Sequence, residues 1–552
     1  MAKYKKKRSG KKYGNYSFSQ VPTLRPNRSR FNRSHDHLTT MDADVLVPIF
    51  VDEVIPGDTF EMTQTSFCRM STPIKPSFTP LYLDTHWFFI PLRLVWKNFQ
   101  KFMGEQDNPD DSTDYLIPVI DVSKYSNFDD FEQSIHDYMG MASEQDGVQL
   151  VSALFYRAYN LTWNEWFRDQ NLQDSVFVNL SDQENLEGDE EYKLLPRGKR
   201  MDYFTSALPW PQKGEPVGLS LSGDAVVSID RDPTNHYPSF SHSQNLEGYL
   251  MVEDGIDGGE KRAVEFQYDS AGTSGFLKWE DPALSGIANL DSVTAVTINQ
   301  LRQAFQLQKF LERDARGGTR YIEIIKSHFG VTNPDYRLQR PEFLGMTHED
   351  VRFTTVAQTS ETGQSSTPQG NLAAMAIAAG QKRAFTKSFT EHGIILGLAS
   401  IYGQQVYQRG INRMWKRQTR VDFFWPEFAH LGEQAIYNYE IYAQGANIKV
   451  GQEEVDSQVF GYQERYAEYR YAPNRVSGKF RSTSPTSLDV WHYAQDFENL
   501  PTLSSEFIEC ATPVSRNLAA QEEPAFMCDF YFGLTCSRPM PMFGTPGYID
   551  HF

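Results

Sequence analysis

The sequence is poor in cysteine, and its cysteines are not spaced for metal binding. Its 552 residues include four of them, Cys68, Cys510, Cys528 and Cys536, and no two are separated by two residues. That number and spacing fit neither a disulfide framework nor a zinc site. We therefore expect reduced, buried thiols, and we predict no metal and no cofactor.

Long apolar runs are also missing. The most apolar stretch, Gly393 to Gly403, is far shorter than the roughly 20 residues that a membrane-spanning helix requires. The basic N-terminus is not followed by the apolar segment of a secretory signal. The sequence predicts no membrane insertion.

Signatures of catalysis are absent as well. Gly478-Lys479 is followed by Phe480, so it is no phosphate-binding loop, and there is neither a His-Glu-x-x-His nor a Gly-x-Ser-x-Gly sequence. Residues 253–264 have Gly255 and Val264 where a calcium loop requires oxygen ligands. We predict no catalytic residues and no enzymatic activity.

The first 35 residues contain no acidic residue, although the whole chain has a net charge of −18. They hold 11 of the 53 Lys and Arg residues, so the chain after His35 carries 42 basic against 71 acidic residues. So polar a segment cannot bury enough apolar surface to offset the entropy lost on folding. We expect residues 1–35 to form a disordered basic arm.

The arm mixes positive charge with aromatic residues, a composition typical of segments that hold single-stranded nucleic acid without reading its sequence. Lys and Arg neutralise phosphates, and aromatic side chains such as Tyr13 and Phe18 stack on unpaired bases. A solubilising or targeting tail is the alternative. The predicted nucleic-acid-binding residues are Lys3, Lys5, Lys6, Lys7, Arg8, Lys11, Lys12, Arg25, Arg28, Arg30 and Arg33.

Strand-like segments lie at both ends of the remaining sequence, at residues 42–62, 81–96, 434–444, 461–471 and 527–536. Pairing segments so far apart produces Greek-key and jelly-roll sandwiches. Between them, apolar residues at helical spacing predict helices over 127–140, 151–167 and 297–317, and a shorter one that ends at Gly330. We expect the apolar stripes of these helices, such as Leu301, Ala304 and Phe305, to pack against the sandwich.

One block differs from the rest in composition. Residues 214–291 contain 14 acidic and 4 basic residues together with ten glycines. Short apolar pieces are separated there by turn-forming residues. We interpret the block as an exposed insertion with small strands of its own, with a plain solvated loop as the alternative.

From about Asp36 to Phe552, block 214–291 excepted, the sequence resembles the major capsid protein of microviruses. It is most similar to the gokushovirus branch of these small, tailless phages with circular single-stranded DNA. The segments that carry the resemblance are MDADVLVPIFVDEVIPGDTFEM, STPIKPSFTPLYLDTHWFFIPLRLVWKNFQKFMGE, DYFTSALPWPQKG, LERDARGGTRYIEIIKSHFGV, RPEFLG and CDFYFGLTCSRPMPMFGTPGYIDHF.

The resemblance implies a mainly β fold, an eight-stranded antiparallel jelly roll with long loop insertions that contain several α-helices. It implies three regions: the arm 1–35, a jelly-roll capsid domain over 36–552, and within it an acidic, Gly-rich surface insertion, 214–291, which builds a threefold protrusion and contributes to host attachment.

The same resemblance implies a function and partners. The function is that of a major capsid protein, which assembles into a T=1 icosahedral shell of sixty copies around circular single-stranded DNA. The implied partners are the chain itself, the viral DNA, a small basic DNA-packaging protein, a scaffolding protein, a pilot protein and a host cell-surface receptor. The implied locations are the virion and, during assembly, the host bacterial cytoplasm.

Two other functions stay open at the level of sequence. A β-sandwich carbohydrate-binding or carbohydrate-active protein is favoured by the nine tryptophans and many carboxylates, and it predicts a small oligomer that binds sugar. A single-strand DNA-binding protein is favoured by the arm alone, and it predicts salt-sensitive DNA binding without a closed particle.

Overall fold

The computed structural model describes residues 27–122, 131–142, 149–183, 192–218, 226–231, 240–242, 247–248, 277–279, 284–289, 298–359 and 372–543. The chain divides into two units. The first comprises residues 1–213 and 312–552, and the second comprises residues 214–311.

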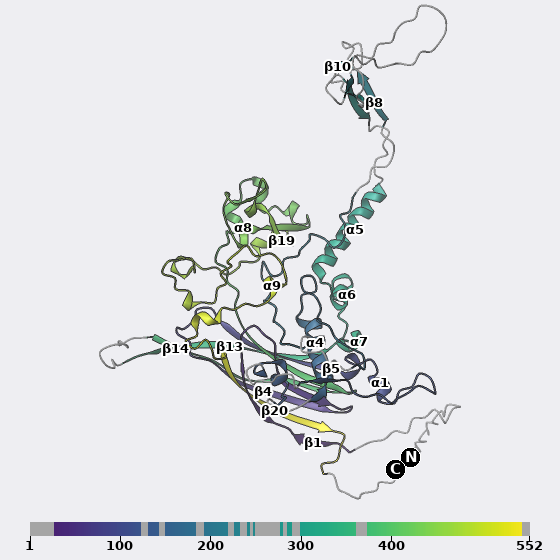
Figure 1. Cartoon of the computed structure of the whole chain (residues 1–552), viewed down its shortest axis with the longest axis vertical. Helices are drawn as coiled ribbons and strands as arrows, with labels where there is room; N and C mark the ends of the chain where they lie inside the picture. The colour runs from purple at the N-terminus through teal and green to yellow at the C-terminus, as the bar shows by residue number, and fades with distance from the viewer. Residues whose placement is uncertain are drawn as a thin grey trace, which may run out of the picture. The chain divides into compact units, whose positions relative to one another are not determined.

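The first unit is built on a β-sandwich whose strands come from both ends of the chain (Figure 1). All its pairings are antiparallel, in the order β1-β20-β4-β14-β13-β5-β15-β3, and β2 also pairs with β20. The strands are β1 (Ser29–Asn32), β2 (His35–Met41), β3 (Val47–Val54), β4 (Thr59–Met70), β5 (Leu81–Pro91), β13 (Glu342–Ala357), β14 (Leu372–Ser388), β15 (Gly393–Gly403) and β20 (Phe526–Arg538).

This pairing is that of a jelly roll. β1 and β2 both pair with β20 and together act as one interrupted strand, which gives eight strands in two sheets, β1/β2-β20-β4-β14 and β13-β5-β15-β3. The long strand β13 connects the sheets, because its first part pairs with β5 and its last part with β14. The predicted eight-stranded, mainly β fold is therefore confirmed.

The sandwich core follows from the alternation of side chains along each strand. In β20, every second residue from Phe526 to Cys536 is buried, and β4 has the same period from Phe60 to Met70. β15 is buried along its whole length, as expected for a strand that is covered on both faces. Two separate clusters of buried residues pack against its two faces.

Trp87 lies at the centre of the space between the sheets. Its ring centroid is 5.3 Å from that of Phe50 and 5.7 Å from that of Phe532, which belongs to the opposite sheet. Gly397 permits this packing, because a Cβ at that position would be 2.9 Å from the Trp87 ring. The aromatic residues of both chain ends thus form one core.

Two insertions carry most of the remaining residues of this unit. The first joins β5 to β13, and its helices supply the second core cluster, in which Tyr159 donates a hydrogen bond to Leu46 O (2.8 Å). Its elements in the first unit are α1 (Phe99–Phe102), β6 (Val119–Asp121), α3 (Ile135–Tyr138), β7 (Leu150–Ser152), α4 (Leu154–Thr162), the π-helix η3 (Trp163–Phe167), α6 (Tyr321–Phe329) and α7 (Asp335–Leu338).

The second insertion joins β15 to β20 and has a core of its own. It contains β16 (Glu433–Tyr437), α8 (Asn438–Ile441), β17 (Lys449–Val450), β18 (Glu453–Glu454), β19 (Val459–Glu464) and α9 (Ser505–Ile508). Short 3₁₀ turns complete the unit: η2 (Leu92–Leu94), η6 (Arg413–Lys416), η7 (Arg420–Asp422), η8 (Pro426–Phe428), η9 (Val455–Ser457), η10 (Ala467–Tyr469), η11 (Gly478–Phe480), η12 (Asp489–Trp491) and η13 (Val514–Asn517).

The second unit falls in the first insertion and has short antiparallel strands. β8 (Val226–Arg231) pairs with β12 (Leu284–Asn289), and β9 (Phe240–His242) pairs with β10 (Glu247–Gly248) and β11 (Leu277–Trp279). Helix α5 (Ile298–Gly317) begins in this unit and ends in the first.

Several local predictions are met, and two are wrong. Helices α5 and α6 end at the predicted positions, α4 continues through η3 to the predicted end at Phe167, and Gly330 has the left-handed conformation (φ 70°) that ends α6. The continuous helix predicted over 127–140 is wrong, because turns at residues 132–134 precede α3; residues 127–130 lie outside the described residues. The segments 434–444 and 461–471 do not join the sandwich, because β16 and β19 pair with each other.

The apolar stripe of α5, with Leu301, Ala304 and Phe305, lies in the second unit. Its packing against the sandwich therefore stays a prediction.

Candidate functional site

The basic arm leads into the sandwich through β1. Of the predicted nucleic-acid-binding residues, Lys3, Lys5, Lys6, Lys7, Arg8, Lys11, Lys12 and Arg25 lie outside the described residues. Arg28, Arg30 and Arg33 lie within them. The prediction of disorder up to His35 is wrong for Ser29–Asn32, which form β1 and pair with the last residues of β20.

The three described arginines each have partners in the sandwich. Arg28 donates hydrogen bonds to Thr59 Oγ1 (2.9 Å) and Ser537 O (3.1 Å). Arg30 forms an ion pair with Glu61 (3.2 Å) in which both side chains are more than half exposed. Arg33 forms a bidentate ion pair with Asp52. These arginines hold β1 and the residues next to it against the sandwich. The composition of the arm did not reveal this role.

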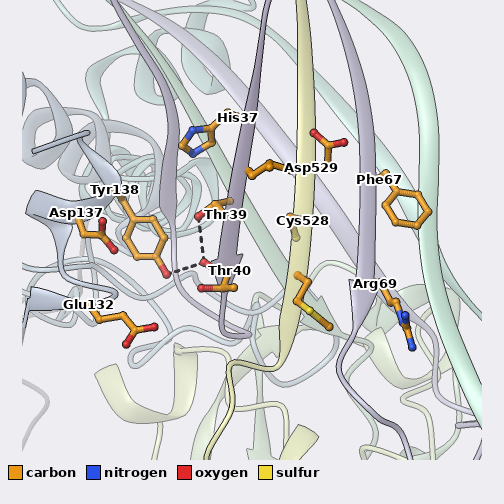
Figure 2. A pocket seen from close by; sticks show the side chains of 12 residues that line it. His37, Thr39, Thr40, Phe67, Arg69, Glu132, Asp137, Tyr138, Cys528 and Asp529 are labelled. Atoms are coloured by element: carbon orange, nitrogen blue, oxygen red, sulfur yellow. Dashed lines mark hydrogen bonds between the residues drawn. The ribbon is translucent and has the colours of Figure 1, made fainter. Parts of the chain in front are cut away.

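A cleft with a volume of about 690 Å³ opens on the outer face of this sheet, beside β2, β4 and β20 (Figure 2). Glu132, Asp137 and Asp529 bring carboxylates to it, whereas Arg69 supplies a cation. Tyr138 donates a hydrogen bond to Thr40 O (2.8 Å), and burial raises the pKa of this tyrosine. Carboxylates around so open a cleft favour binding of a basic or polar partner. They do not make the cleft a catalytic site, because no nucleophilic side chain that lines it has an adjacent general base among the described residues.

The cysteines next to this cleft are unreactive. Cys68 and Cys528 face each other across β4 and β20, and both are buried. Burial raises the pKa of the Cys68 thiol well above its ordinary value, so the thiolate is disfavoured. All four cysteines are free and buried, as the sequence predicts.

A buried polar cluster is centred on Asp84 in β5. Arg197 Nη2 donates to Asp84 Oδ2 (2.6 Å), Tyr402 donates to the same oxygen (2.9 Å), and His348 contacts the other oxygen. Burial alone raises the pKa of Asp84, but the Arg197 charge and these hydrogen bonds outweigh it and lower that pKa below its ordinary value. The carboxylate therefore stays ionised and ties the first insertion to the sandwich.

Within the ranges given above, no three His, Cys, Asp or Glu side chains are grouped as metal ligands. No helix in those ranges is both long and apolar enough to cross a bilayer.

Sequence reasoning missed an exposed apolar surface in the second insertion. Its signal was the run RMWKRQTRVDFFW, which contains four cations and four aromatic residues within 13 positions. Arg417 holds it in place, because it forms an ion pair with Glu468 (3.0 Å) while its guanidinium lies over the Tyr469 ring (4.3 Å). Phe423 also lies beside the Arg417 guanidinium (5.6 Å), and the ring centroids of Phe424 and Tyr469 are 6.3 Å apart. We define the aromatic surface as these three exposed rings together with the exposed side chains of the same run, Met414, Trp415 and Val421.

Comparison with known proteins identifies the family. The family model described as "Capsid protein (F protein)" matches residues 19–548. The chain belongs to this capsid protein family. The sequence resemblance to microvirus capsid proteins is thereby confirmed, and so is the prediction of a structural protein without enzymatic activity.

Three relatives, each named "Capsid protein VP1", match almost the full chain. The protein of Bdellovibrio phage phiMH2K is 45% identical over 551 residues, which cover 98% of this chain and 99% of the relative. The protein of Chlamydia phage 1 is 41% identical, with 96% and 97% covered. That of Spiroplasma virus 4 is 35% identical, with 94% and 95% covered. A capsid protein assembles with copies of itself into the shell of a virion.

Proposed function

We propose that sixty copies of this chain assemble into a T=1 icosahedral shell around a circular single-stranded DNA genome. The family match over residues 19–548 carries this proposal. The fold supports it, because a jelly roll gives each subunit a rigid body while long insertions remain free for contacts between subunits. Closed rotational symmetry repeats each such contact around the shell, so that modest contacts become strong together.

The test uses lysate from infected host cells. After nuclease treatment, the lysate is fractionated on a sucrose gradient, and the fast fractions are imaged by electron microscopy. We expect uniform icosahedral particles that contain this 63.3 kDa chain and protected circular single-stranded DNA. If a productive infection left the chain only at the top of the gradient, the shell would be excluded.

Within this shell, the basic arm contacts DNA on the inner face. Arg28, Arg30 and Arg33 already have partners in the sandwich, so we assign most of the contact with DNA to the lysines at positions 3–12, Arg8 and Arg25. A small basic packaging protein supplies further charge. Deletion of residues 2–26 leaves β1 intact and should lower the DNA content of the particles. Unchanged DNA content and particle yield would show that the arm has another role.

Residues 214–291 form a protrusion at the threefold axes and contribute to host attachment. Their excess of acidic residues and glycines supports a solvated surface element. Deletion of this block should leave particles that assemble but adsorb poorly to host cells. Unchanged adsorption would remove host attachment from the proposal. A host receptor, a scaffolding protein and a pilot protein complete the proposed partners, and assembly takes place in the host cytoplasm.

A further inference from the structure

No side chain of the aromatic surface belongs to a core cluster of the described residues. Trp415 is 72% exposed, and Phe423 and Phe424 are about half exposed. Large exposed apolar patches mark interaction sites in soluble proteins, and Trp, Tyr and Arg dominate the energetics of such interfaces. Its exposed charged residues are mainly basic: Lys416 and Arg420 form no ion pair with a described residue, and Asp422 is the one carboxylate of the run. A partner for this surface therefore combines apolar side chains with negative charge.

We propose that the aromatic surface docks onto the acidic loop at residues 105–114 of a second copy of this chain. This inference rests on the proposed shell, because it names one of the contacts through which the subunits associate. The partner is a protein surface. Burial of apolar side chains at the centre of the contact and opposite charges at its rim hold the two subunits together.

The acidic loop complements the aromatic surface in both respects. It contains five carboxylates and no cation, at Glu105, Asp107, Asp110, Asp111 and Asp114. Within the described chain, only Asp107 and Asp111 have an ion-pair partner, Lys101, at 3.4 and 3.9 Å. Leu116, which follows the loop, is 86% exposed. Carboxylates beside an exposed aliphatic residue match the cations and rings of the other surface.

The positions of the two surfaces favour a contact between copies. In Figure 1, α8 lies far from α1, which directly precedes the acidic loop. The segment of the aromatic surface lies beside α8, because Lys416 Nζ is 5.3 Å from the centroid of the Tyr439 ring in that helix. Both helices belong to the first unit. Two complementary patches that are well separated on one subunit cannot meet within it. They form a head-to-tail contact between copies, which closes into a ring when the rotation between neighbours is that of a closed symmetry.

Single-stranded DNA is the other partner that suits aromatic rings and cations. The location argues against it. The basic arm enters the fold at β1, and Figure 1 places β1 at the end of the first unit away from α8 and β19. If the arm marks the side that faces DNA, the aromatic surface is not on that side.

The test is a charge exchange in the full chain, expressed from the complete viral genome in its host. One variant reverses the rim cations (Lys416→Glu with Arg420→Glu), and a second reverses two unpaired carboxylates (Asp110→Lys with Asp114→Lys). A third combines all four changes. Lys449→Glu in the exposed β17–β18 hairpin is the matched control. Thermal unfolding of each chain shows whether it still folds.

We expect each two-residue variant to fold as the unchanged chain does and to lower particle yield by about tenfold or more, because the contact repeats around the shell. The four-residue variant should recover much of that yield, and the control should retain it. Normal yield from either two-residue variant would overturn the proposal. So would a four-residue variant that is no better than its parents, or particles that form normally but lack protected DNA. Absence of particles from the unchanged chain would instead refute the shell itself.

Discussion

Aromatic residues occur in two settings in this chain. In the sandwich, Trp87 is fully buried between Phe50 and Phe532. In the second insertion, Trp415 in η6 and Phe424 are exposed, on a segment that the ion pair of Arg417 with Glu468 holds in place. Burial of the first group stabilises the folded subunit. The second group leaves apolar surface in contact with water, so its burial can stabilise only a complex in which a partner covers it.

Truncation of the buried ring gives the largest expected effect. Trp87→Ala should lower the free energy of unfolding by about 3–5 kcal/mol, because the lost contacts leave a cavity between the two sheets. Trp415→Ala, the matched control, should change it by at most about 0.5 kcal/mol. Chemical denaturation of the soluble subunit measures both. Equal losses in the two variants would mean that Trp415 also belongs to a core.

The buried ion pair of Asp84 with Arg197 gives the next largest expected effect on stability. Asp84→Asn leaves the Arg197 charge buried without its counter-ion, so we expect a loss of about 3–5 kcal/mol in the free energy of unfolding. The folded-state pKa of Asp84 is lowered, so its stabilisation is complete above about pH 4 and is lost as the pH falls further. A variant whose unfolding curve matches that of the unchanged chain at pH 7 would contradict this role.

His86 gives a smaller effect that depends on pH. Burial lowers the pKa of this histidine from 6.5 to about 4. The unfolded chain therefore takes up the proton first, and the stabilisation present above pH 6.5 is lost as the pH falls toward 4. His86→Phe keeps a ring beside Phe167. In this variant, the melting temperature should fall less between pH 7 and pH 5 than it does in the unchanged chain. If it falls equally in both, groups other than His86 cause the loss of stability at low pH.

The exposed ion pair gives the smallest effect. Arg30 and Glu61 are both more than half exposed, and pairs of this kind contribute about 0–1 kcal/mol. Arg30→Ala should therefore shift the melting temperature very little, and less still at high salt. A loss comparable to that of Asp84→Asn would mean that β1 needs this pair in order to dock.

Three strands of the sandwich, β3, β5 and β20, could be predicted from the sequence, and so could the end of α6 at Gly330, because apolar alternation and a glycine after a helix are local signals. β13, β14, β15 and most of β4 were not predicted. β1 could not be predicted, because Ser29–Asn32 has no strong apolar alternation and pairs with residues about 500 positions away. The pairing of β16 with β19 was missed because periodicity identifies a strand and not its partner.

The candidate sites were also predicted only in part. The arm was visible as a run of charges, yet the partners of Arg28, Arg30 and Arg33 depend on the folded sheet. The aromatic surface combines segments about 50 residues apart, which the pair of Arg417 with Glu468 brings together. Helical spacing identified the apolar face of α5, but spacing does not say what covers a face.

One measurement tests the central claim that folding and association use separate aromatic clusters of a shell protein. It is the sedimentation of nuclease-treated lysate from cells that express either the unchanged genome or its Trp415→Ala variant. We predict that the unchanged chain sediments as DNA-containing particles, whereas the variant stays mostly at the top of the gradient with an unchanged melting temperature. Equal sedimentation of both chains as particles would contradict the assignment of the aromatic surface. An unchanged chain that never enters the fast fractions would contradict the shell.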